Sequence, residues 1–131
     1  MRTLSCTTLA LMLALPGAAA DASGGGGGPL SFVAMDEASV PIIDGNRTAG
    51  TLKFKLVLEA RDEAAAAAAT AAMPLLRSAS LGAGAEFARL YASPMMPLDA
   101  RRLASDMTAA LRAADPGIDR VLLVEVMAVG S

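Results

Sequence analysis

Alternation of large apolar residues with mostly polar ones over positions 51–59 constrains the fold of this chain more than any other feature. The even-numbered positions are all large and apolar: Leu52, Phe54, Leu56 and Leu58. The odd-numbered positions are mostly polar: Thr51, Lys53, Lys55, Val57 and Glu59. Because successive side chains of a β-strand point to opposite faces, one face of this strand belongs in a core and the other faces water or a partner.

Further strands are expected on both sides of this one in the sequence. Two short β-prone runs, residues 30–34 and 39–43, precede it, and a turn signal at residues 44–46 indicates a loose hairpin. Pro41 marks an edge or a strand start. Residues 118–129 are almost continuously apolar, which is typical of a strand buried on both faces, so we predict a central position in the sheet for this strand.

The first of two main helices is expected from residue 61 to about residue 78. Asp62 and Glu63 complement the helix dipole, and the alanine run at 64–69 is a strong helix former. Pro74 is expected to kink this helix. The alanines serve either as a close-packing surface, against the sheet or a second subunit, or as filler.

The second main helix is expected over residues 97–114, with Pro97 at its first position. Its apolar stripe consists of Ala100, Leu103, Met107, Ala110, Leu111 and Ala114. Residues 80–94 are expected to be irregular, apart from a short helix at 85–91. This order of elements predicts an α+β domain, in which a small antiparallel-type sheet (the N-terminal hairpin plus the long C-terminal strand) packs with two main helices.

The N-terminus has the pattern of a secretory signal peptide at residues 1–20. Arg2 precedes an apolar run at 4–15, a Pro-Gly pair breaks the run, and three alanines offer small residues for cleavage. The run is shorter than the roughly 20 residues that span a bilayer. The alternative is an uncleaved anchor helix that includes the alanines. A glycine-rich linker at 21–29 and one domain at 30–131 complete the expected organisation.

Composition argues against several function classes. Cys6, the only cysteine, lies within the expected signal, and the chain has no histidine, so the usual nucleophiles, general bases and transition-metal ligands are missing after cleavage. Loss of Arg2 changes the formal net charge from −2 to −3, with 10 basic against 13 acidic residues, which argues against nucleic-acid binding. We therefore expect no enzyme activity, no catalytic, cofactor-binding or metal-binding residues, and no cofactor.

Three local features have two interpretations each. The five glycines at 24–28 lack the strand, helix and Lys-Ser/Thr pair of a phosphate-binding loop, which favours a linker. Asp36, Asp44 and Asn46 do not follow the spacing of a calcium loop, which favours turn chemistry. Glu125 is either an exposed or paired strand position or a site carboxylate. The first is favoured because no second carboxylate lies nearby in sequence.

Four stretches of the domain, in this order, carry a family resemblance. Residues 32–43 are the opening strand region of the domain, and residues 51–59 form a strand that is followed directly by an acidic, alanine-rich helix. Residues 72–77 read Ala-Met-Pro-Leu-Leu-Arg, and residues 119–126 read Asp-Arg-Val-Leu-Leu-Val-Glu-Val. Together they resemble the periplasmic domain of the FliL family of flagellar basal-body-associated proteins, over residues 30–129.

The resemblance implies a fold similar to the stomatin/prohibitin domain and a non-enzymatic role in the periplasm. FliL proteins assemble around the flagellar stator, so the resemblance implies stator components as partners, homo-oligomers, and a part in motility and chemotaxis. Arg120 and Glu125 are then framework positions without a site role. The chain departs from the family in its cleavable N-terminal pattern and in residues 80–84, which lack the usual Ser-rich stretch.

Two alternatives to a FliL-like role are an adaptor or ligand-binding module and a small hydrolase. A periplasmic adaptor or ligand-binding module of another cell-envelope complex would use the exposed face of residues 51–59 or the linker. A small hydrolase would need an activated serine, but the sequence has no Gly-x-Ser-x-Gly elbow and no histidine.

The N-terminal pattern leads to a first testable prediction. We expect the mature chain to begin at Asp21 and to fractionate with the periplasm, close to the membrane without spanning it, because the apolar run is too short for a stable span. N-terminal sequencing of the fractionated protein measures this. A chain that keeps residues 1–20 in the inner-membrane fraction would support the anchor interpretation instead.

Overall fold

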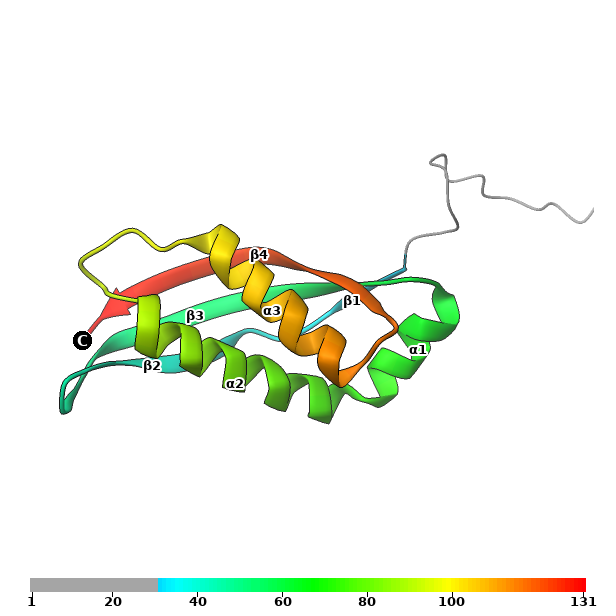
Figure 1. The fold of residues 1–131 in the computed structure, drawn as a ribbon, viewed down its shortest axis with the longest axis horizontal. Helices are drawn as coiled ribbons and strands as arrows, with labels where there is room; N and C mark the ends of the chain where they lie inside the picture. Colours follow the sequence, from blue (N-terminus) through cyan, green and yellow to red (C-terminus); the bar gives the residue numbers. More distant parts are fainter. Residues whose placement is uncertain (1–30) are drawn as a thin grey trace, which may run out of the picture.

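The computed structural model describes residues 31–131. Its elements are β1 (Ser31–Ala34), β2 (Ala38–Asp44), β3 (Arg47–Ala60), α1 (Glu63–Ala71), α2 (Met73–Tyr91), α3 (Ala100–Ala114) and β4 (Ile118–Gly130) (Figure 1). The expected signal peptide and linker, together with Cys6 and the glycines at 24–28, lie outside the described residues. The prediction of an α+β domain with a small antiparallel sheet is confirmed.

The alternating strand, β3, is the centre of the sheet. β1 pairs with positions 57–60 of β3 and β2 with positions 47–54, so the two short strands share one edge. β4 pairs with positions 50–60 along the other edge, and every pairing is antiparallel. The predicted hairpin is confirmed as β2 and β3, but it is tight and not loose, because Asp44 pairs with Arg47 across a two-residue turn.

The C-terminal strand is not central, contrary to the expectation from its apolar run. Among the described strands, β4 pairs only with β3, so it is an edge strand. Ile118 and Val121 are buried, but Val124 is 61% exposed. An apolar run indicates that a segment favours a sheet, but it does not reveal how many neighbours the strand will have.

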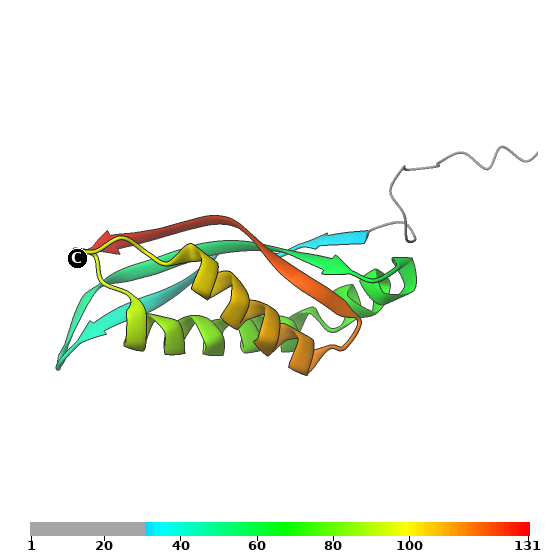
Figure 2. The same cartoon turned by 45° about the horizontal axis from the view of Figure 1, so that its top comes forward.

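The helices cover one face of the sheet (Figure 2). The core forms between this layer and the even-numbered side chains of β3 from Leu52 to Ala60, which are at most 2% exposed. The large helix residues that complete it are Leu76, Phe87, Leu103, Met107 and Leu111. Each such side chain contributes roughly 1.5–3 kcal/mol when it leaves water, so this layer supplies most of the apolar stabilisation.

The helix predicted over residues 61–78 is in fact two helices. Asp62 caps α1 by accepting a hydrogen bond from the Ala65 N–H at 2.7 Å. The helix is interrupted at Ala72, which lies between α1 and α2. Pro74 lies in the first turn of α2, where its missing N–H costs no helical hydrogen bond. Pro74 therefore begins a helix and does not kink one.

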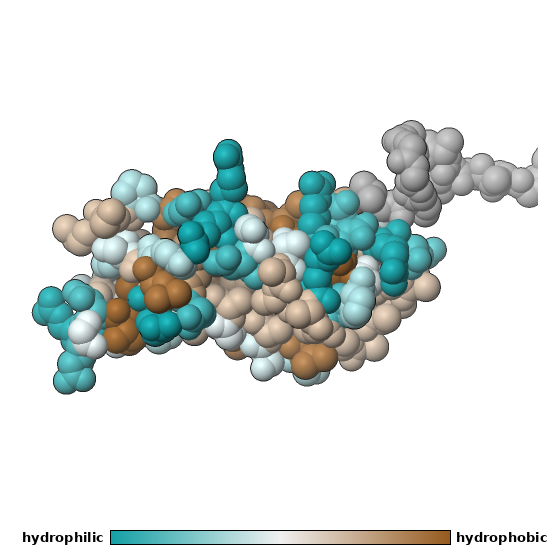
Figure 3. All heavy atoms as spheres, viewed as in Figure 1, coloured by the Kyte–Doolittle hydropathy of each residue, from teal (hydrophilic) through white to brown (hydrophobic). Residues whose placement is uncertain are grey.

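The alanine run has a mixed role in α1. Ala69 is fully buried against the core, whereas most of the other alanines of the run are at the surface. Figure 3 shows the result as a broad, weakly apolar surface around α1 and the start of α2. Close packing against the sheet thus applies to one position of the run.

α2 continues to Tyr91, so the prediction of irregular backbone is wrong at residues 80–84, whereas residues 92–94 are irregular as predicted and the short helix expected at 85–91 is the end of α2. Gly84 is buried where α2 crosses the sheet, and a Cβ there would lie 2.7 Å from Cε1 of Phe54. The close approach of helix and sheet requires glycine at this position, and the burial it permits outweighs the poor helix propensity of the residue.

α3 begins later than predicted, at Ala100. The side chain of Asp99 accepts a hydrogen bond from the Arg102 N–H at 2.9 Å and so forms the N-cap, which leaves Pro97 in the preceding loop. The predicted apolar stripe is confirmed at its large residues, because Leu103, Met107 and Leu111 are all fully buried.

The close approach at Gly84 leads to a prediction about stability. Gly84→Ala should lower the free energy of unfolding by about 1–3 kcal/mol, because the added methyl collides with the Phe54 ring. Gly82 is the matched control, since no neighbouring atom lies within 4 Å of its Cβ position. Gly82→Ala should raise the free energy of unfolding by roughly 0.5–1 kcal/mol through helix propensity. Urea unfolding measures both, and equal effects would contradict the close approach.

Candidate interaction surface

The sheet face opposite the helices is uncovered within residues 31–131 (Figure 2). We call it the open face. Directly opposite residues of an antiparallel pair lie on the same face, so the odd-numbered residues of β3 define it together with their cross-strand partners. Those partners are Phe32, Ala34, Ser39, Pro41, Arg120, Leu122, Glu125, Met127 and Val129.

Apolar side chains are prominent on the open face. Phe32 is 54% exposed, and Met127 and Val129 of β4 are 42% and 43% exposed. Val124 is the extra residue of a β-bulge, because the register between β3 and β4 shifts at this point, and it is also largely exposed. Several large apolar side chains on one uncovered sheet are typical of a surface that binds another protein.

Charged residues lie between these apolar side chains. Lys55 is directly opposite Glu125 across the β3–β4 pair, an arrangement in which opposite charges attract. Lys53 is directly opposite Met127, one rung further along the same face. Glu125 is exposed, which confirms its interpretation as an exposed strand position.

The ion pair between Glu59 and Arg120 lies at one end of the open face, and its carboxylate is nearly buried. The side chain of Glu59 is 9% exposed and accepts a hydrogen bond from Nε of Arg120, whose side chain is 63% exposed. The two residues are partners in the β3–β4 register, and Phe32 lies opposite Glu59 on the other side. The ion pair therefore joins β3 to β4 beside an exposed aromatic ring.

The residues considered as calcium ligands are not brought together. Asp36 forms an ion pair with Arg77 of α2 at 2.9 Å. Asp44 and Asn46 belong to the β2–β3 turn, where Gly45 has a φ of 63°, and the whole of β2 separates them from Asp36. The described part of the chain contains no group of three His, Cys, Asp or Glu residues placed to hold a metal ion. Asn46 lies in the β2–β3 turn and Asp44 at its start, which are the positions that the turn interpretation predicts.

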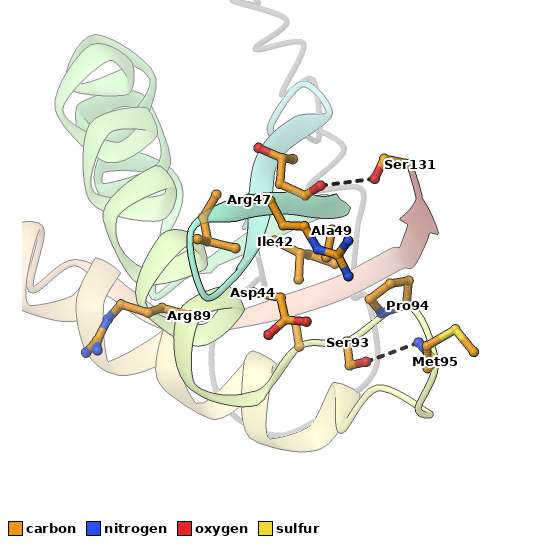
Figure 4. A pocket seen from close by; sticks show the side chains of 12 residues that line it. Ile42, Asp44, Arg47, Ala49, Arg89, Ser93, Pro94, Met95 and Ser131 are labelled. Atoms are coloured by element: carbon orange, nitrogen blue, oxygen red, sulfur yellow. Dashed lines mark hydrogen bonds between the residues drawn. The ribbon is translucent and has the colours of Figure 1, made fainter.

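A hollow of about 530 Å³ lies between the β2–β3 turn and the loop after α2 (Figure 4). Two of its hydroxyl groups form local hydrogen bonds: Ser93 Oγ accepts from the Met95 N–H at 3.1 Å, and Ser131 Oγ donates to the Thr48 carbonyl at 3.1 Å. Arg89 points away from the other labelled side chains and pairs with Glu86 at 2.7 Å. This hydrogen bond lowers the pKa of Glu86 and raises the pKa of Arg89. Asp44 and Arg47 are the other charged residues that line the hollow, and its lining among residues 31–131 includes no histidine or cysteine (Figure 4).

Comparison with known proteins assigns no family to this chain. No family of known proteins matches it, and no curated protein matches it. Across residues 31–131, no helix combines the length and apolar character that a membrane crossing needs. The open face is therefore interpreted from its own residues.

The Glu59–Arg120 pair leads to a second prediction about stability. Arg120→Ala should lower the free energy of unfolding by about 1–3 kcal/mol, because it leaves a nearly buried carboxylate without its partner. Arg77→Ala is the matched control and should cost less than about 1 kcal/mol, since its partner Asp36 is 88% exposed. Urea unfolding measures both variants. Adding Glu59→Gln to Arg120→Ala should recover part of the loss, and no recovery would contradict this explanation.

Proposed function

We propose that this chain is a non-enzymatic, FliL-like periplasmic protein that associates with the flagellar basal body and supports motility. In this proposal its partners include stator components, and it forms homo-oligomers with a stomatin/prohibitin-like fold. The open face is the observation that carries the proposal. It combines exposed apolar side chains with charged ones, as protein-binding surfaces do.

The positions of the four FliL-like stretches support this proposal. Residues 32–43 include most of β1 and of β2, residues 51–59 lie within β3, and residues 119–126 lie within β4. Residues 72–77 begin α2 on the covered side. Three of the four stretches thus supply most of the sheet, and the open face is built from them together with Met127 and Val129, which follow the last stretch.

The periplasmic location in this proposal rests on residues 1–20, which have the signal pattern. A cleaved chain would depend on its partners to stay beside the motor, whereas an uncleaved chain would be anchored in the inner membrane. Exposed apolar residues on the open face suit either case, because both require contact with another protein.

A second candidate function uses the same surface. A periplasmic adaptor or ligand-binding module of another cell-envelope complex would bind its partner through the open face as well. The mixture of lysines with apolar side chains on this face favours a protein partner without identifying the partner as a motor component.

A complementation experiment tests the proposed function. Deletion of the gene should reduce swimming, and the wild-type chain should restore it. The double variant Val124→Lys/Met127→Lys should fold normally, because both side chains are exposed, but should weaken partner binding by about tenfold or more. Leu75→Lys is the matched control, since Leu75 is 56% exposed on α2, away from the open face. Swim-ring growth and affinity capture of stator components measure the effect.

Each contrary outcome has a definite meaning. Full complementation by the double variant would show that the open face is not the binding surface. Normal swimming of the deletion strain, with capture of a different envelope complex by the wild-type chain, would replace the flagellar proposal with the adaptor function.

A further inference from the structure

The outer edge of β4 is a second surface, separate from the open face. The Met35 N–H donates to the Leu56 carbonyl at 3.0 Å, so the peptide groups of the even-numbered β3 residues face β1 and β2. Hydrogen-bonded and non-hydrogen-bonded rungs alternate in an antiparallel pair. Val126 and Ala128 lie opposite even-numbered β3 residues, so their N–H and C=O groups point away from β3.

This edge lacks most of the features that normally prevent strand addition. Natural sheet edges are usually shortened, broken, or occupied by Pro and Lys. The edge formed by β1 and β2 follows this rule, because it is interrupted at residues 35–37 and contains Pro41. β4 is 13 residues long, and Glu125 is its only charged residue from position 121 onward. The bulge at Val124 is its one irregularity in that stretch.

α3 borders this edge with a basic face. Thr108 Oγ accepts a hydrogen bond from the Val121 N–H at 3.1 Å, so the Thr108 face of α3 lies beside the outer edge of β4. Arg101 and Arg112 are on the same face, since they lie seven residues before and four residues after Thr108. Both are exposed, and neither forms an ion pair within residues 31–131. Figure 3 shows hydrophilic side chains along the rim where α3 meets β4.

We propose that this edge binds an extended acidic peptide segment of a partner protein as an added β-strand. The outward peptide groups of Val126 and Ala128 would form the ladder. Every second peptide side chain would lie on the α3 side, where carboxylates toward the C-terminal end of β4 would meet Arg101 and those toward its start would meet Arg112. The intervening side chains would be apolar and lie on the open-face side.

A second copy of the chain fits this edge less well than an acidic peptide. Two β4 edges paired about a two-fold axis would bring the basic faces of two α3 helices together, and like charges across an interface oppose binding. The proposed flagellar role does not use this edge, so the two proposals stand or fall independently.

Fluorescence polarisation with the full chain tests the proposal. The probe is a labelled peptide of about eight residues that alternates Glu with Val, a length close to that of a typical strand. Saturable binding is expected, and it should weaken as salt is raised. Arg101→Glu/Arg112→Glu should reduce the affinity roughly tenfold, because two favourable charge contacts become unfavourable. Arg47→Glu, at an exposed arginine next to the β2–β3 turn, is the control and should leave the affinity unchanged.

Peptide variants test strand addition without any change to the protein. A Glu-Val peptide with its valine amides N-methylated cannot donate to the ladder, and a Lys-Val peptide has the wrong charge, so neither should bind. The proposal is overturned by equal binding of either control peptide, or by failure of the Glu-Val peptide to bind the folded wild-type chain. It is also overturned if the chain dimerises through β4 and the peptide does not compete, because the occupant is then a second copy.

Discussion

The contact between Phe54 and Gly84 is the interaction on which the rest of the structure depends. Phe54 is almost completely buried at the centre of the central strand, and its ring fits only because position 84 of α2 has no side chain. A Cβ at that position would also lie 3.3 Å from Cε of Met107 in α3. One glycine thus allows both long helices to lie close to the same strand, and interiors packed to this density tolerate little added volume.

The close helix layer explains why the two faces of the sheet differ so strongly. The helices supply large apolar side chains to one face only, so β3 buries its even-numbered side chains from Leu52 to Ala60, while most of its odd-numbered side chains stay at least partly exposed. The open face is therefore free to carry lysines, an ion pair and exposed apolar side chains. The core therefore places little constraint on which residues this face carries.

Sequence patterns predicted the elements that depend on local chemistry. The alternation at residues 51–59 was sufficient to predict β3, because a strand with one covered face has period two. The β2–β3 turn was predicted for a similar reason, since its residues favour turns wherever they occur. The apolar stripe of α3 was also correct, although the helix begins at an Asp cap that competes with Pro97 as a start signal.

The errors concern features that depend on distant parts of the chain. Gly82 and Gly84 suggested an irregular stretch, but the space at Gly84 is needed by Phe54, which lies 30 residues earlier. β4 was predicted to be central from its apolar run, yet only the pairing of the whole sheet determines which strand has one neighbour. The open face was expected in part, from the odd-numbered residues of β3, whereas the contribution of β4 and its bulge required the register between the two strands.

The domain is elongated along β3. Ser31 lies opposite the last residue of β3, whereas Gly130 lies opposite Gly50 near its start, and 14 residues of strand span about 45 Å. The loop with Met95, which is 88% exposed, lies at the far end beside the β2–β3 turn (Figure 4). A partner bound at Ser31 would therefore contact the domain at one end only. A tilt of about 20° there would swing this loop by about 15 Å, given that strand length.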